Sequence, residues 1–195
     1  MSIGNTATSW GWLARLFHWL MAVLIFGMLG FGIYLVQAYN PGDPAKLYLV
    51  QTHKSFGFVV FAMVCVRLIW RAVNPTPKLP ATISPMMQLA AKFGHWVLYM
   101  LMLAMPVTGW LASSASPYND ADAYPMQIKN MVFGLFEMPD PFATGSHALS
   151  DQFMAAHFYV SLALIAVLAV HVVAAIKHAA VDRDGVMERM IRGCE

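Results

Sequence analysis

The sequence predicts an all-α integral membrane protein, an up-down four-helix transmembrane bundle that forms one domain over residues 1–195. The chain is 59% hydrophobic and 11% charged, whereas soluble domains contain about 25% charged residues. Four apolar segments reach the roughly 20 residues that a helix needs to cross a bilayer. Because the links between these segments do not cross the membrane, successive helices are expected to alternate in direction.

The first apolar segment spans about residues 12–36 and carries one charge, Arg15, near its start. This segment is much longer than the roughly 7–15 apolar residues of a secretory signal peptide, so we expect a retained membrane helix. A short polar link follows. Its run Asn40-Pro41-Gly42-Asp43-Pro44 is a strong turn signal.

The second segment spans about residues 50–73, with Lys54 near its start and Arg67 and Arg71 near its end. Prolines in the next link end this helix, because proline lacks the backbone N–H that a helix uses. The third segment spans about residues 89–112.

The fourth segment spans about residues 153–180, and residues 113–151 form the long loop before it. A loop of this length without a strong helix of its own is usually functional or mobile. Its apolar run over residues 131–136 predicts that it lies on the membrane surface. This loop could also be the docking site of a soluble redox partner, which would favour a shuttle or an anchor subunit.

The basic residues predict the orientation of the bundle. Nine of the 12 lysines and arginines fall in the N-terminal region, the second link and the C-terminal tail, on one side of the predicted bundle. Because cytoplasmic loops carry an excess of basic residues, both termini are expected in the cytoplasm. The formal charge of +2 and the lack of a long basic run argue against nucleic-acid binding.

Histidines provide the clearest functional signal. Ionisable side chains are costly within a membrane and are functional by default. Six of the seven histidines fall in or at the edges of the predicted helices, and the seventh, His147, is expected to be a solvated loop residue. The six are His18, His53, His95, His157, His171 and His178.

The spacing on the fourth segment predicts two metal centres at different depths. His157 and His171 are 14 residues apart. At about 100° and 1.5 Å per residue they lie within about 40° of one helix face and about 21 Å apart along it. Two haems stacked through a bilayer need an offset of this size.

Depth along the helices then predicts the partners. His18 lies about as far from the cytoplasmic end as His171, and His53 lies at the opposite end with His157. We therefore expect two b-type haems, each held by two histidines as iron ligands, which suits electron transfer. The chain has no Cys-x-x-Cys-His sequence, so neither haem would be covalently attached.

Other residues could contact the haems. Gly57, four residues after His53, leaves room for a porphyrin ring. Arg15, Arg67 and Arg71 lie at the level of the cytoplasmic haem, where they would bind propionates or serve as cytoplasmic anchors.

Two histidines have open roles. His95 could replace His18 as a ligand of the cytoplasmic haem. His178 lies seven residues after His171 on the same face, where it could contact a quinone or a propionate or extend to the membrane interface. These two residues are the candidates for a catalytic site.

Several stretches together resemble one family. They are Arg15-Leu16-Phe17-His18-Trp19, His53-Lys54-Ser55-Phe56-Gly57, Arg67-Leu68-Ile69-Trp70-Arg71, Gly94-His95-Trp96-Val97-Leu98-Tyr99, Pro106-Val107-Thr108-Gly109-Trp110 and Phe133-Gly134-Leu135-Phe136-Glu137-Met138-Pro139. With the spaced histidines of the last segment, they resemble the bacterial cytochrome b561 family and, more broadly, the cytochrome b subunits of hydrogenases and formate dehydrogenases.

The resemblance implies haem ligation by His18, His53, His157 and His171. It also implies a multi-pass protein of the bacterial inner membrane and an activity like that of a superoxide oxidase, in which superoxide donates electrons and ubiquinone or another membrane quinone accepts them. A quinone site near His178 or His95 would follow.

Two alternatives stay open at this point. The chain could be a quinol-linked shuttle or the membrane anchor of a larger dehydrogenase. It could also be a haem-free transporter or scaffold, although a metal transporter would more naturally carry Asp or Glu within its helices, and these segments contain none.

Overall fold

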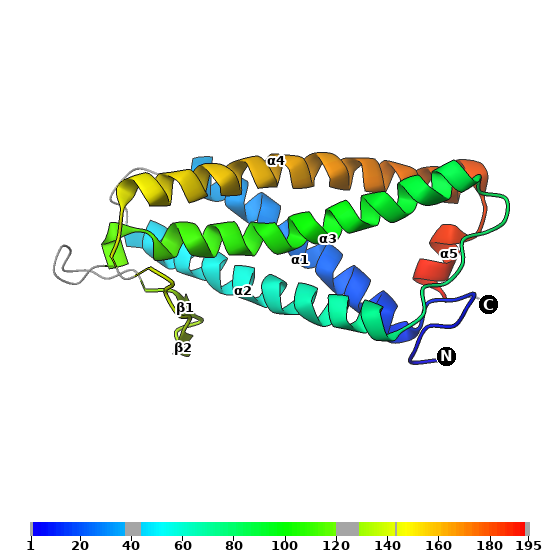
Figure 1. Cartoon of the computed structure of the whole chain (residues 1–195), viewed down its shortest axis with the longest axis horizontal. Helices are drawn as coiled ribbons and strands as arrows, with labels where there is room; N and C mark the ends of the chain where they lie inside the picture. Colours follow the sequence, from blue (N-terminus) through cyan, green and yellow to red (C-terminus); the bar gives the residue numbers. More distant parts are fainter. Residues whose placement is uncertain (1, 38–43, 120–128, 143, 194–195) are drawn as a thin grey trace. The chain divides into compact units, whose positions relative to one another are not determined.

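The computed structural model describes residues 2–37, 44–119, 129–142 and 144–193 (Figure 1). Long helices dominate this part of the chain: α1 (Trp12–Gln37), α2 (Pro44–Val73), α3 (Pro85–Ser114) and α4 (His147–Lys177). Within the described ranges these four helices are long and apolar enough to cross a membrane, which confirms the predicted fold class. The expected turn at Asn40, Pro41, Gly42 and Asp43 lies outside the described residues.

Three helices begin four to six residues earlier than the apolar segments indicated, at Pro44, Pro85 and His147. Proline suits the first turn of a helix, because its fixed φ is already helical and its missing N–H has no helical partner there. Serine residues also cap the first turns of two of these helices. The hydroxyl oxygens of Ser84 and Ser146 accept backbone N–H bonds from the first turns of α3 and α4 at 3.4 Å.

The earlier start of α4 changes the place of His147. This residue is exposed, as expected, but it is the first residue of α4 and not a loop residue. Its ring contacts that of Tyr118, with centroids 6.1 Å apart. The longer helix also takes in Asp151, so an acidic residue does lie near one end of a candidate span.

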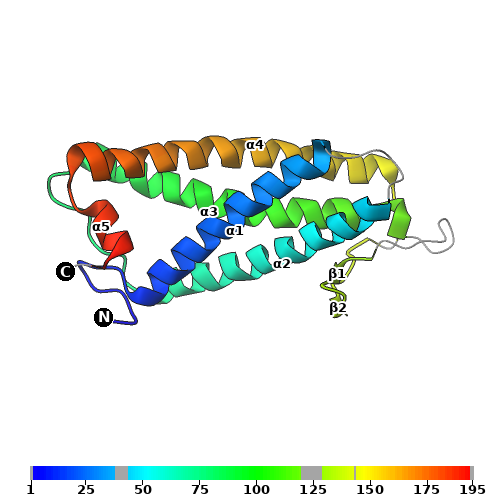
Figure 2. The ribbon, with the colours of Figure 1, turned by 180° about the vertical axis from the view of Figure 1, so that it is seen from behind.

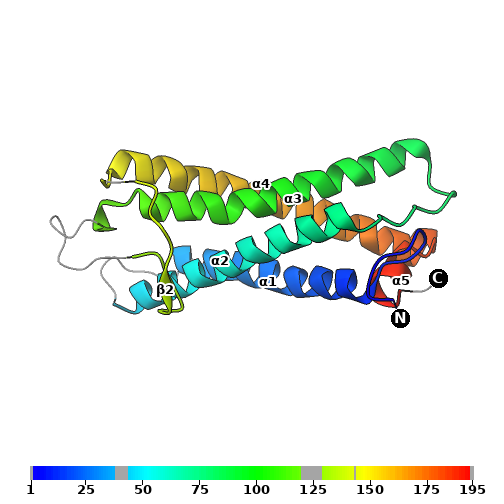
Figure 3. The same ribbon diagram turned by 60° about the horizontal axis from the view of Figure 1, so that its bottom comes forward.

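The long loop contains a small hairpin that the sequence did not predict. Strands β1 (Met131–Val132) and β2 (Phe136–Glu137) pair antiparallel, with Met131 opposite Glu137. Phe133 and Gly134 turn the chain with φ values of 49° and 72°, as a tight hairpin turn requires. The Phe133 N–H donates to the hydroxyl of Ser55 at 2.9 Å, which holds the hairpin beside α2 (Figure 3).

The end of α4 is also more structured than expected. Its last turn continues as a π-helical turn, η2 (His178–Asp182), and a short helix, α5 (Val186–Ile191), follows. Arg183 and Gly185 between them adopt left-handed φ values of 49° and 80°. Figure 2 shows α5 beside the two chain ends.

The described chain falls into two compact units. Unit 1 consists of Met1–Val23, Met63–Leu101 and Ala163–Glu195, and unit 2 of Leu24–Ala62 and Met102–Leu162. Within unit 1, the first parts of α1 and α3 meet the last parts of α2 and α4, so helices adjacent in sequence run in opposite directions there. The expected single domain stays a prediction.

Candidate functional site

Unit 1 brings His18 of α1 and His171 of α4 together. Their ring centroids are 6.2 Å apart, and the two ring planes are inclined by 58°. His18 lies about two turns inside α1, and each side chain is partly buried. The two residues that the sequence placed at matching depth therefore face each other in the folded chain.

Unit 2 contains the corresponding pair, His53 of α2 and His157 of α4. Their ring centroids are 6.4 Å apart, with an interplanar angle of 84°. The Nδ1 atom of His53 is buried and makes no hydrogen bond within the described structure. Such an unpaired polar atom is costly unless the ring interacts with another group.

Both pairs fit an iron ion between two imidazoles. Imidazole–metal bonds are about 2 Å long, and the bonding nitrogen lies about 1.1 Å from the ring centre, so an intervening metal separates the centroids by about 6.2 Å. The observed separations of 6.2 and 6.4 Å agree with this value. The surface of α2 is also open at Gly57, one turn after His53. A Cβ added at Gly57 would meet no atom within 4 Å.

The ring of His157 is oriented by α3. Its Nδ1 lies 2.9 Å from the carbonyl oxygen of Met105 and 3.2 Å from the hydroxyl of Thr108. Because Nδ1–H donates to the carbonyl, the lone pair lies on Nε2, which is the nitrogen then free to bind a metal. Gly109 permits this approach, since a Cβ there would lie 3.1 Å from Cε1 of His157.

His18 has a different neighbour. The Arg67 guanidinium donates from Nη2 to Nδ1 of His18 at 3.0 Å, so a neutral His18 ring carries its hydrogen on Nε2. Metal ligation through Nε2 requires a free lone pair on that nitrogen, with the ring hydrogen on Nδ1. The Arg67 contact and metal binding through Nε2 of His18 are therefore alternatives, and binding would release the guanidinium to pair with a carboxylate such as a haem propionate.

The other two predicted arginines also lie in unit 1. Arg71 stacks over the rings of Trp96 and Tyr99, at 5.3 and 5.4 Å from their centroids. Arg15 instead donates from Nη1 to the Ile191 carbonyl at 2.9 Å. Arg67 and Arg71 thus lie near the histidine pair or its neighbouring aromatic rings, whereas Arg15 connects α1 to α5.

A third imidazole approaches His171. The ring centroid of His95 lies 5.6 Å from that of His171, closer than the centroid of His18. The geometry leaves both His18 and His95 as possible partners of His171.

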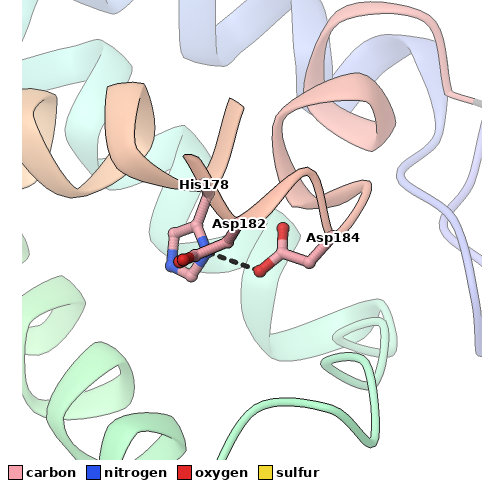
Figure 4. Close-up of side chains that lie close together, drawn as sticks. All are labelled: His178, Asp182 and Asp184. Carbon is pink, nitrogen blue, oxygen red and sulfur yellow. Dashed lines mark hydrogen bonds and ion pairs between the residues drawn. The ribbon is translucent and has the colours of Figure 1, made fainter. Parts of the chain in front are cut away.

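His178 forms a polar cluster with two carboxylates (Figure 4). Its Nδ1 lies 2.6 Å from Oδ2 of Asp184 and 3.5 Å from Oδ2 of Asp182. Asp182 also pairs with Lys177. Asp184 was not recognised from the sequence, because the turn that returns it to His178 follows an irregular π-helical segment.

The sequence did not predict that Thr108 and Gly109 orient His157, although both lie in the family-like stretch from Pro106 to Trp110. Thr108 and Gly109 follow Pro106 within one turn of α3. A helix-interior proline next to a small residue and a hydroxyl is a recognisable signal of close helix approach in membranes. The Met105 carbonyl gives no such signal, because every residue has one.

Comparison with known proteins gives a consistent result. The profile of the prokaryotic cytochrome b561 family matches residues 9–193. A protein of Escherichia coli K12 named cytochrome b561 homolog 2 is 33% identical over 192 residues, covering 98% of this chain and 95% of the relative. A Yersinia pestis protein named as a probable superoxide oxidase is 26% identical over 177 residues, covering 89% and 90%.

Proposed function

The chain belongs to the prokaryotic cytochrome b561 family, and we propose that it is a superoxide:quinone oxidoreductase that holds two b-type haems. Membership of this family makes it a multi-pass bacterial membrane protein of electron transfer that binds haem b. The number of haems, their ligands and the two substrates are the proposal.

The observation that carries the proposal is the pair of facing imidazoles in each unit, with centroids 6.2 and 6.4 Å apart. His18 and His171 would hold one haem, and His53 and His157 the other. Bound haem supplies one-electron redox chemistry at its iron. The protein would contribute the imidazole ligands and orient their rings, and two protein ligands on one iron would leave no room there for other ligands.

We propose that both termini face the cytoplasm in the bacterial inner membrane, because the basic residues gather on that side. Superoxide would donate electrons on the unit 2 side. A membrane quinone would accept them in unit 1, near His178 or His95.

The superoxide assignment draws on the Yersinia pestis relative, whose name gives that activity. A solution assay tests it directly. Purified protein is mixed with an enzymatic superoxide source and a water-soluble quinone, and quinol formation is followed. We expect quinol to form faster than in the protein-free mixture and to stop when superoxide dismutase is added. Equal rates with and without the protein would refute the superoxide assignment.

A quinol-linked shuttle, or the membrane anchor of a larger dehydrogenase, is the second candidate. The hairpin tip favours it, because Leu135 and Phe136 are 81% and 55% exposed. Exposed apolar tips of this kind are suited to a protein partner or to the membrane surface. Haems that are reduced by quinol but not by superoxide would favour this candidate over the first.

A haem-free transporter or scaffold would give no b-type absorption bands at all. A reduced-minus-oxidised visible spectrum of the purified chain tests this. We expect b-type bands and, by pyridine haemochrome assay, two haems per chain.

A further inference from the structure

The end of α4 folds back on itself at a titratable cluster. After the π-helical turn η2, the left-handed residue Arg183 reverses the chain and brings Asp184 against His178. The carboxylate Oδ2 lies 2.6 Å from Nδ1 of the ring (Figure 4). This is a short, charge-assisted contact between two residues that are six apart in sequence.

The carboxylate is held in a fixed position. Its other oxygen, Oδ1, accepts the backbone N–H of Val186 at 3.2 Å, and its side chain is only 9% exposed. The helix that follows, α5, is attached to the start of α1. There, Arg15 and Trp19 donate to the carbonyls of Ile191 and Met190 at 2.9 and 3.2 Å.

This contact decides which ring nitrogen carries the hydrogen in the neutral ring. An ionised carboxylate can only accept a hydrogen bond, so Nδ1 keeps its hydrogen whether the ring is neutral or charged. The lone pair of the neutral ring then lies on Nε2. The second carboxylate, Asp182, is 3.5 Å from the ring and pairs with Lys177, so Asp184 is the closer partner of the imidazole.

The position of His178 connects the cluster to the redox site of unit 1. Seven helical residues turn by about 700° and rise about 10.5 Å, so His178 lies on nearly the same face as His171, about two turns beyond it. A ligand bound between them would contact the Nε2 side of the ring, since Nδ1 faces Asp184.

We infer that Asp184 is a positioning residue that holds His178 as the proton donor to a quinone reduced in unit 1. The inference rests on the proposed function. Two superoxide ions lose one electron each and become two molecules of oxygen, while one quinone gains two electrons and two protons to become the quinol. Superoxide brings no protons, so both come from water, which leaves two hydroxide ions. Because the two quinone oxygens lie on opposite sides of the ring, Nε2 of His178 passes one proton to the nearer oxygen, and the other oxygen takes its proton from water directly.

The variant Asp184→Asn tests the inference with little change of shape. Its amide oxygen can still accept the Val186 N–H, but its NH₂ group would donate to Nδ1 of His178. The ring hydrogen then lies on Nε2 and cannot leave without forming an imidazolate. We expect a 10- to 100-fold lower rate of quinol formation, as is common when an outer carboxylate partner of a functional histidine is lost, with both haems retained and their reduction by superoxide unchanged.

Two further variants separate positioning from folding. Asp184→Glu retains a carboxylate, and we expect it to recover at least part of the rate lost in Asp184→Asn and to keep the solvent deuterium isotope effect of the unaltered protein. Asp182→Asn makes the same charge change beside the ring. We expect its rate of quinol formation to fall at most about fivefold, because an exposed ion pair contributes little.

The outcomes distinguish this inference from the proposed function. If the unaltered protein forms no quinol, the proposed function fails and the inference fails with it. If that protein is active and Asp184→Asn forms quinol equally fast, only the role of Asp184 is wrong. The inference is also overturned if Asp184→Glu is as slow as Asp184→Asn while both variants retain two haems, since that result indicates a structural role.

Discussion

The two units hold their histidine pairs in different ways. In unit 2, neutral groups of α3 contact His157, namely the Met105 carbonyl and the Thr108 hydroxyl. In unit 1, a guanidinium contacts His18, and a third imidazole, His95, approaches His171. A positive charge beside a redox centre stabilises its reduced form. The charged neighbour of His18 therefore predicts a higher midpoint potential for a haem bound in unit 1 than the neutral neighbours of His157 predict for a haem bound in unit 2.

The largest expected effect is the loss of one haem. His157→Ala should remove the haem of unit 2 and leave that of unit 1, because each unit supplies its own pair of ligands. Haem content should fall from two per chain to one by pyridine haemochrome assay. The matched control His147→Ala changes a histidine of the same helix far from either pair and should retain both haems. Two haems in His157→Ala would contradict the pairing.

The next prediction concerns unit 1, where His18 and His95 both lie near His171. If His18 is the ligand, His18→Ala should lose the unit 1 haem, whereas His95→Ala should bind two haems with unchanged low-spin spectra. The measurement is haem content together with the visible spectrum of each variant. The reverse result would assign the second axial position to His95.

A smaller effect is expected from crowding the ring of His157. In Gly109→Ala, the new Cβ would lie 3.1 Å from Cε1 and 3.2 Å from Nδ1 of that ring. The ring must then shift from the Met105 carbonyl, and we expect the unit 2 haem to bind about 10- to 100-fold more weakly. Gly94→Ala in unit 1 meets no atom within 4 Å and serves as the control. Equal haem retention by both variants during dilution would count against this role for Gly109.

The smallest effect concerns the charge difference itself. Arg67→Gln removes the positive charge beside His18 and should lower the midpoint potential of the unit 1 haem by on the order of 50 mV, a Coulomb effect at an effective dielectric constant of about 20. Spectroscopic redox titration measures it. Arg71→Gln, whose guanidinium stacks on Trp96 and Tyr99, should shift the potential less. An unchanged potential in Arg67→Gln would show that this guanidinium does not raise the potential of the unit 1 haem.

The apolar segments predicted the four long helices well but not where three of them begin. Hydropathy reports the part of a helix that lipid surrounds, whereas the caps at Ser84 and Ser146 lie outside the apolar runs. The hairpin was missed for another reason. Each strand of the hairpin is only two residues long, so its residues show no periodic pattern. One of the turn residues is Phe133, a residue type that rarely adopts a positive φ, so no turn motif indicates the hairpin either.

The sequence by itself determined the class of fold, the family and the depth of each histidine along its helix, because a regular helix has a constant rise and rotation per residue. Only the tertiary structure decided what each ring touches. The Met105 carbonyl on His157, Arg67 on His18 and Asp184 on His178 all come from other helices or from an irregular turn. Helical periodicity gives the direction of a side chain from its own axis, but the atoms it meets depend on how neighbouring segments pack.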